Sequence, residues 1–159
     1  IMGLTNEEIC EGIAHAKTIA GRTNLITLGD VLVIDDCYNA NPVSMKASLD
    51  VLAQAEGRKI AVLGDMGELG ENEREMHYDV GKYAANTGVD ILFCCGTLSE
   101  ELAKGAQRGH TKVMYFAERE KLTQTLLNFV KAGDTVLVKA SHFMEFPKIV
   151  KALEEALED

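Results

Sequence analysis

The sequence predicts an α/β fold: a Rossmann-like three-layer sandwich in which helices cover both faces of a mainly parallel, six-stranded sheet. Short apolar runs alternate along the chain with amphipathic segments of helical length, a pattern typical of repeated β-α-β units. Two of the apolar runs are separated only by Gly29 and Asp30, which predicts one antiparallel hairpin strand beside five parallel strands. A length of 159 residues suits one domain with its own core.

The first 20 residues are predicted to form an amphipathic helix. Thr5 and Glu8 make a capping box at its start, and apolar residues then recur at helical spacing. The plausible domain boundary follows at 21–24. We therefore expect residues 1–20 to be the end of a preceding domain and residues 21–159 to form the Rossmann-like domain.

After the hairpin turn, strands and helices alternate to the end of the chain. This alternation predicts right-handed crossovers between parallel strands. The strands are expected at 31–34, 59–64, 90–96, 112–116 and 134–141, and the helices at 42–57, 71–88, 98–109, 118–133 and 146–158.

The charge of the chain argues against several classes of partner. Acidic residues outnumber basic ones by 25 to 16, which gives a formal charge of -9. Because no basic cluster is present, this charge should repel phosphate backbones, and a nucleic-acid partner is not expected. The apolar runs are far shorter than the roughly 20 residues of a membrane span, and the first residues lack the features of a signal peptide. We expect a cytoplasmic protein without a membrane partner, and we expect it to be monomeric.

The four cysteines are Cys10, Cys37, Cys94 and Cys95, and their spacing would not gather metal ligands. Cys94 and Cys95 are adjacent within an apolar strand, so we expect them to be small buried hydrophobic residues, and we interpret Cys37 in the same way. No metal site is predicted in this chain.

Ligands of open α/β sheets bind at the carboxyl ends of the strands, which selects the loops to examine. These loops are 35–42, 64–73, 95–99, 116–120 and 139–146. In the first loop, DDCYNANP, Asn41 is suited to a helix N-cap and Pro42 to the first helical position. Asp36 has no such local role, and a strand-end carboxylate is suited to bind a ribose hydroxyl or a cation.

The second loop contains GDMGELG, residues 64–70. Its three glycines would let the backbone approach a ligand closely or adopt positive φ, although it is neither a P-loop nor a G-x-G-x-x-G motif. An ordinary glycine-rich turn is the open alternative. Asp65 and Glu68 either bind a substrate amine or are merely solvated.

The last loop, KASHF, places Lys139, Ser141 and His142 at the end of the final strand. A lone histidine in a loop is more often a surface or packing residue than a catalyst. Its position on the expected ligand edge nevertheless favours a role in binding.

The acid pair, the later Asp65 and the strand-end lysine also resemble the pattern of a response-regulator receiver domain. Only one β-α unit separates Asp36 from Asp65, whereas a receiver places its acceptor aspartate two units on. The spacing therefore argues against a receiver. A receiver-like or free-standing nucleotide- or phosphate-binding module remains the non-enzymatic alternative.

Four motifs together resemble the C-terminal domain of the Mur ligases: GR at 21–22, DDCYNANP, GDMGELG and LVKAS, in this order and spacing. The resemblance runs from about Gly21 to the end of the chain. DDxYNANP and GDMxELG favour the type that joins D-alanyl-D-alanine to UDP-N-acetylmuramoyl-tripeptide. Another Mur or folylpolyglutamate-type ligase is the open alternative.

This resemblance implies part of a three-domain, ATP-dependent ligase that acts in peptidoglycan precursor synthesis, with ATP, D-alanyl-D-alanine and UDP-N-acetylmuramoyl-tripeptide as its partners. It implies that Asp36 contacts the ribose of ATP. The other implied ATP contacts are Arg22, Tyr38, Asn39 and Asn41, and the implied acceptor loops contain Gly64, Asp65, Ser141 and His142.

The resemblance also implies what the chain lacks. The P-loop, the Mg²⁺ ligands and the modified lysine of the family belong to its central domain, and no GxxxxGK[ST] occurs in these 159 residues. We expect no catalytic residue here and no turnover of ATP by the chain alone. Many family members read KGSR where this chain reads KASH, so His142 could replace an arginine contact to the dipeptide carboxylate only when protonated or through a neutral N–H donor.

Overall fold

Within residues 23–157, the part of the chain that the structure describes, six strands form one sheet. The structure is a computed structural model, and its strands lie in the order β1-β2-β6-β3-β4-β5. β1 runs antiparallel to β2, and the other neighbouring pairs are parallel, which confirms the predicted sheet. The strands are β1 (Asn24–Leu28), β2 (Val31–Asp35), β3 (Arg58–Gly64), β4 (Ile91–Cys95), β5 (Lys112–Phe116) and β6 (Asp134–Lys139).

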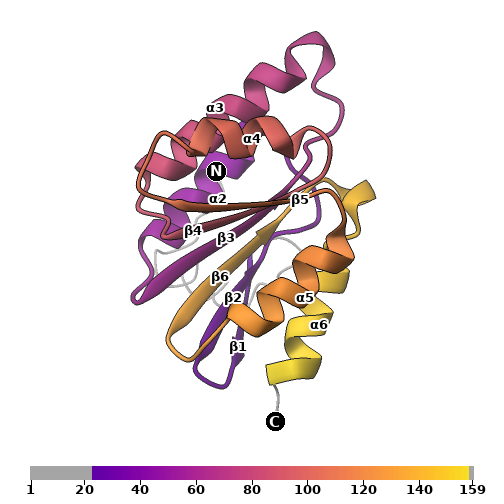
Figure 1. Ribbon diagram of the computed structural model, residues 1–159. Coiled ribbons are helices and arrows are strands. Elements are labelled where there is room, and N and C mark those ends of the chain that lie inside the picture. The colour runs from indigo at the N-terminus through magenta and orange to yellow at the C-terminus, as the bar shows by residue number, and fades with distance from the viewer. Residues whose placement is uncertain (1–22, 158–159) are drawn as a thin grey trace, which may run out of the picture.

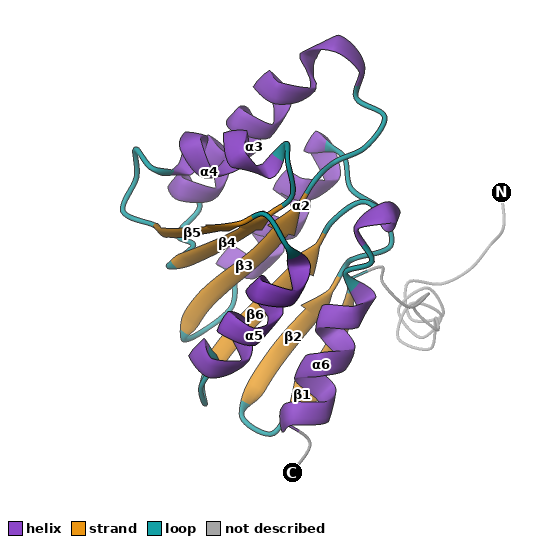
Figure 2. Cartoon of the chain, turned by 45° about the vertical axis from the view of Figure 1, so that its right-hand side comes forward, coloured by secondary structure: helices purple, strands orange, loops and turns teal. Residues whose placement is uncertain are grey.

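Helices cover both faces of this sheet, as Figures 1 and 2 show. Alternate residues of one strand enter different cores, because successive side chains point to opposite faces. Ile60 and Val62 pack with the helices of one face, and Ala61 and Leu63 with those of the other. The predicted three-layer sandwich is confirmed. One face carries α2 (Pro42–Ala53), α3 (Glu73–Asn86) and α4 (Ser99–Ala106), and the other carries α5 (Arg119–Phe129) and α6 (Pro147–Leu157).

The helices begin within two residues of their predicted positions, but α2 and α5 end four residues earlier than predicted and α4 ends three residues earlier. α2 ends at Ala53, and the chain then turns through Gly57, whose φ of +74° is one that glycine adopts without steric cost. Two 3₁₀ turns were not predicted: η1 (Gly70–Asn72), which overlaps the first residues of the predicted helix at 71–88, and η2 (His142–Met144), in the loop after β6. The predicted helix at 1–20 lies outside the described residues, so the division into two domains stays a prediction.

The position of β6 decides where ligands can bind. β6 lies between β2 and β3. The loops after β2 and β3 lead to α2 and α3 on one face, whereas the loop after β6 leads to α6 on the opposite face. In open α/β sheets a crevice forms where neighbouring connections diverge in this way. The topology therefore creates two crevices, one on each side of the carboxyl end of β6.

Candidate functional site

The crevice between β2 and β6 contains a cavity of about 490 Å³, which we call the first pocket. Its walls are the loop after β2, the end of β6 and one face of α2. Four of the five predicted ATP contacts line it, and the fifth, Arg22, lies outside the described residues. The first pocket is lined by Thr23, Asp36, Tyr38, Asn39, Asn41, Ser44, Ala47, Ser48, Val51 and Lys139.

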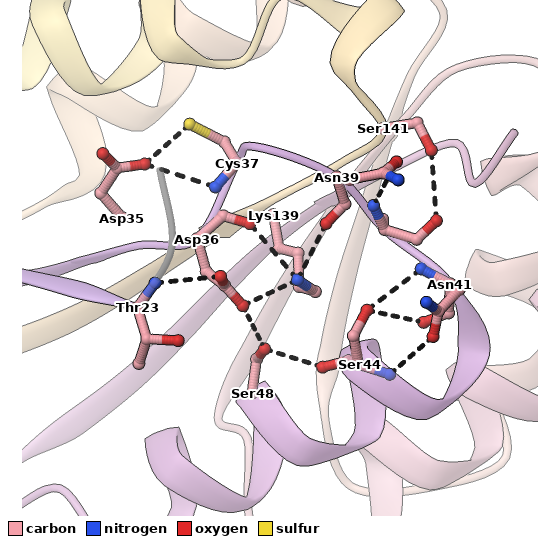
Figure 3. Close-up of polar contacts among 11 residues, drawn as sticks. Thr23, Asp35, Asp36, Cys37, Asn39, Asn41, Ser44, Ser48, Lys139 and Ser141 are labelled. Atoms are coloured by element: carbon pink, nitrogen blue, oxygen red, sulfur yellow. Dashed lines mark hydrogen bonds and ion pairs between the residues drawn. The ribbon is translucent and has the colours of Figure 1, made fainter. Parts of the chain in front are cut away.

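Asp36 provides the carboxylate of the first pocket, and its side chain is held from three directions. The backbone N–H of Thr23 donates to Oδ1 at 3.0 Å, and the Ser48 hydroxyl donates to Oδ2 at 2.5 Å. Lys139 forms an ion pair with the same Oδ2, at 2.7 Å (Figure 3). A carboxylate has about four lone-pair positions, so these contacts leave capacity for one ligand hydroxyl.

Two local hydrogen-bonded pairs shape the rest of the DDCYNANP loop (Figure 3). Asn41 is the N-cap of α2, as predicted: its side chain accepts from the Ser44 N–H, and the Ser44 hydroxyl accepts from the Asn41 N–H. The Cys37 thiol donates to Asp35, and burial together with this carboxylate raises the pKa of the thiol. Cys37 is therefore an inert, buried residue, as predicted.

The crevice between β3 and β6 contains a second pocket of about 420 Å³. Ser141 joins its two sides, because its hydroxyl oxygen accepts from the Gly67 N–H at 2.8 Å and donates to the Ala40 carbonyl at 3.3 Å. The structure therefore brings the GDMGELG and KASHF loops together beside the DDCYNANP loop. The second pocket is lined by Tyr38, Asn39, Gly67, Glu68, Ser141, His142 and Phe143.

The second pocket combines aromatic rings with one acid. The rings of Tyr38 and His142 lie 6.3 Å apart, and Phe143 is 62% exposed. A Cβ on Gly67 would lie 3.0 Å from the Phe143 ring, so the glycine allows this ring to approach the backbone. Glu68 has a φ of +60°, an uncommon conformation for a residue with a side chain. This pocket thus offers a carboxylate, an imidazole and apolar surface to a small ligand.

Gly64 and Asp65, predicted from the resemblance to face the acceptor, do not line either pocket. Asp65 is buried, and its Oδ1 accepts from both the N–H and the hydroxyl of Ser99 at 2.7 Å, at the start of α4. A Cβ on Gly64 would lie 2.6 Å from the Phe146 ring, so this glycine permits close packing under the loop. Both residues support the loop of the second pocket, and their contact with an acceptor stays a prediction.

Several residues of the site were not among the predicted contacts. Ser48 lies one helical turn after Ser44, and this spacing could have placed it on the same face of α2. Lys139 is the last residue of β6. Its position in the sequence does not reveal that Asp36 is its ion-pair partner. His77 of α3 is fully buried, and its Nε2 accepts from the N–H of Met66, in the GDMGELG loop, at 2.9 Å.

Two further findings concern residues 23–157 only. No group of three or more His, Cys, Asp or Glu side chains gathers there in a way that could hold a metal ion. None of the helices in this range has the length and apolar character that crossing a bilayer requires.

Comparison with known proteins decides the family. Residues 21–142 match the family described as "Mur ligase, glutamate ligase domain". The chain belongs to the Mur ligase family. The matched range contains every lining residue of the two pockets except Phe143, so both pockets are part of the Mur ligase domain. The predicted family is confirmed.

Individual relatives of this Mur ligase chain include ligases of one substrate type. The UDP-N-acetylmuramoyl-tripeptide–D-alanyl-D-alanine ligase of Bacillus subtilis (strain 168) is 35% identical over 97% of this chain. A crystal structure of MurF from Acinetobacter baumannii has a TM-score of 0.86 at 33% identity over 97% of this chain. MurF from Thermotoga maritima, solved in complex with ADP, has a TM-score of 0.78 at 28% identity over 95%. The Mur ligase chain spans 35%, 35% and 37% of these three proteins, respectively.

Proposed function

We propose that this chain is the C-terminal domain of an ATP-dependent, cytoplasmic ligase that adds D-alanyl-D-alanine to UDP-N-acetylmuramoyl-tripeptide in peptidoglycan precursor synthesis. The observation that carries the proposal is the pair of adjacent pockets on either side of β6, which share Tyr38 and Asn39. A ligation needs a nucleotide and an amine acceptor close together, and two neighbouring pockets of different chemistry meet that need.

In this proposal the first pocket binds the ribose side of ATP. The remaining capacity of the Asp36 carboxylate accepts a hydrogen bond from a ribose hydroxyl, and Tyr38, Asn39 and Asn41 line the same pocket. The ADP complex of the Thermotoga maritima relative supports a nucleotide ligand. Arg22 is proposed as a further ATP contact on the resemblance alone.

The second pocket is proposed to bind the acceptor dipeptide, which carries an ammonium group, two methyl groups and a carboxylate. Glu68 supplies a negative charge for the ammonium, and Phe143 supplies apolar surface for the methyl groups. His142 would reach the dipeptide carboxylate through an N–H donor. The loops of Gly64, Asp65 and Ser141 hold these groups in place.

The proposed reaction has two steps. The γ-phosphoryl group of ATP passes to the tripeptide carboxylate, giving an acyl phosphate and ADP. The neutral amine of the dipeptide then attacks the acyl carbon, the amide bond forms, and inorganic phosphate leaves with the bonding electrons. This chain would bind and orient the reactants, whereas the P-loop and the ligands of Mg²⁺ would lie in another part of the ligase, where the ion would neutralise phosphate charge.

The proposal is tested by Asp36→Ala in the full-length ligase. Because a lost hydrogen bond to a charged group costs about 1.5–3 kcal/mol, we expect the KM for ATP to rise about tenfold to a hundredfold. Steady-state kinetics with the purified enzyme would measure this change. Asp30→Ala, in the exposed turn at the other end of β2, is the matched control and should leave the KM for ATP unaltered. An unchanged KM in Asp36→Ala would contradict the assignment of the first pocket.

A further inference from the structure

The first and second pockets are separated by two residues of the DDCYNANP loop. Tyr38 and Asn39 line both pockets, so this segment forms part of the wall of each. We call Tyr38–Asn39 the shared wall. Any group that fixes the shared wall therefore affects the shape of both pockets at once.

Lys139 is the side chain that connects the shared wall to the carboxylate of the first pocket. Its Nζ donates to Asp36 Oδ2 at 2.7 Å and to the Asn39 carbonyl oxygen at 3.0 Å. A third contact, at 3.4 Å, joins Nζ to the Asp36 carbonyl oxygen. Figure 3 shows the ammonium group at the centre of these contacts, between Asp36 and Asn39.

Lys139 lines the first pocket, but the hydrogens of its ammonium group are all engaged by acceptors of the protein. Its side chain is 2% exposed, and an ammonium group has three hydrogens to donate, each of which has an acceptor here. A buried lysine is costly unless it is paired and hydrogen-bonded, so these contacts determine where Asp36 and Asn39 lie. The effect of Lys139 on ligands must therefore pass through those two residues.

We propose that Lys139 is a positioning residue that sets the orientation of the Asp36 carboxylate and fixes the shared wall, and so links the nucleotide pocket to the acceptor pocket. This inference rests on the proposed function, in which the two pockets bind ATP and the dipeptide. It assigns to one buried side chain a role in the affinity for both substrates, exerted through Asp36 and Asn39.

The test uses three variants of the full-length ligase: Lys139→Met, Asp36→Asn and the double variant. Methionine keeps the length and apolar stem of lysine but removes the ammonium group. We expect Lys139→Met to raise the KM for ATP about tenfold and the KM for D-alanyl-D-alanine about threefold, since the contacts of the ammonium with both Asp36 and Asn39 are lost. In the double variant, the increase in the KM for ATP should be smaller than the product of the two single effects, because Lys139 acts through Asp36.

A matched control separates positioning from general destabilisation. Asp134 lies at the other end of β6, is buried, and pairs with Arg58 at 2.6 Å. Asp134→Asn should lower the Tm as Lys139→Met does, but both KM values should stay within about twofold of the unmodified enzyme, because Asp134 lies at the strand end away from the pockets. Equal KM increases in both variants would overturn the proposal.

The remaining outcomes are also decisive. An unchanged KM for both substrates in Lys139→Met, or fully multiplicative effects on the KM for ATP, would reject the positioning role. If Lys139→Met does not fold, the double variant leaves no unpaired buried charge and is compared with Asp36→Asn: a higher KM for the dipeptide supports the proposal, and an equal one rejects it. If Asp36→Asn itself leaves the KM for ATP unchanged, the proposed function fails, whatever Lys139 does.

Discussion

At the scale of single residues, the two pockets differ in how much of their polar chemistry is already used within the protein. Three donors within the protein already contact the Asp36 carboxylate. The Ser141 hydroxyl likewise both donates and accepts within the protein. Glu68 and His142, in contrast, are exposed residues at the second pocket. In the proposed function, these two side chains are therefore the groups through which acceptor specificity should be altered most directly.

Glu68→Gln is expected to weaken binding of the dipeptide without affecting ATP. An exposed ion pair contributes roughly 0.2–1 kcal/mol, so the KM for D-alanyl-D-alanine should rise about two- to fivefold. Kinetics of the full-length ligase at fixed, saturating ATP would measure the change. Glu71→Gln, three residues further along in η1 and also exposed, is the control with the same loss of charge. Identical KM values in the two variants would rule out an ammonium contact at Glu68.

At the scale of elements, η2 is the short segment that carries His142 and Phe143 into the second pocket. It is held by the start of α5, since Arg119 donates to the Met144 carbonyl oxygen at 3.3 Å and to Glu145 at 2.9 Å. Lys148 of α6 also donates to Glu145, at 2.8 Å. The 3₁₀ turn was not predicted, because its stability depends on these partners rather than on its own three residues.

These contacts predict a pH dependence for Glu145. Hydrogen bonds from Lys148 and Arg119 lower the pKa of Glu145 from 4.5 to about 2. A carboxyl group with a lowered folded pKa contributes stability above its unfolded pKa and loses it as the pH falls through the folded value. The Tm difference between the unmodified protein and Glu145→Gln should therefore be constant above about pH 5. It should shrink as the pH falls from about 4.5 to 2.

Thermal unfolding of both proteins across this pH range, at low salt, would measure that difference. The effect will be modest, because the group is exposed and the ion pair is screened by solvent. Glu56→Gln, in the exposed turn after α2, controls for the loss of one surface charge. A Tm difference that persisted unchanged to pH 2 would show that the ion pairs of Glu145 do not stabilise η2.

At the scale of the whole molecule, the two pockets lie at the carboxyl end of β6, one on each side of that strand. The walls come from this chain, but GxxxxGK[ST] does not occur in its sequence, and no metal-binding group is present among the described residues. Catalysis of phosphoryl transfer depends on positioned phosphates and metal ions, which the described part of the chain does not supply. In the proposed function, the P-loop and the Mg²⁺ ligands belong to another part of the ligase, so the chain is predicted to act only together with that part.

The 159-residue chain alone is accordingly expected to release no phosphate from ATP, with or without D-alanyl-D-alanine. A coupled assay for inorganic phosphate would measure this, and the full-length ligase with all three substrates is the positive control. The Asp36→Ala variant of the chain serves as the negative control for a trace contaminant. Turnover by the purified chain that Asp36→Ala abolishes would contradict the inference.

Much of this organisation could be predicted from local patterns. The strand at 112–116 was placed at its observed limits, and the hairpin at Gly29 and Asp30 forms as expected. The Asn41 cap was also correct, because a capping box is encoded within four residues. The resemblance placed Asp65 in an acceptor loop, but its carboxylate is turned to Ser99. A position at the ligand edge does not determine which neighbour a side chain contacts.

The sequence by itself determined the α/β class, the alternation of strands and helices, and the motifs that mark the Mur ligase family, because these are carried by short-range periodicity and local spacing. Only the tertiary structure decided that β6 enters the sheet between β2 and β3. That insertion brings Lys139 to Asp36 across 103 positions of the chain and opens a pocket on each side of the strand. Strand order depends on how whole elements pack around the cores, and this information is not present in any one segment.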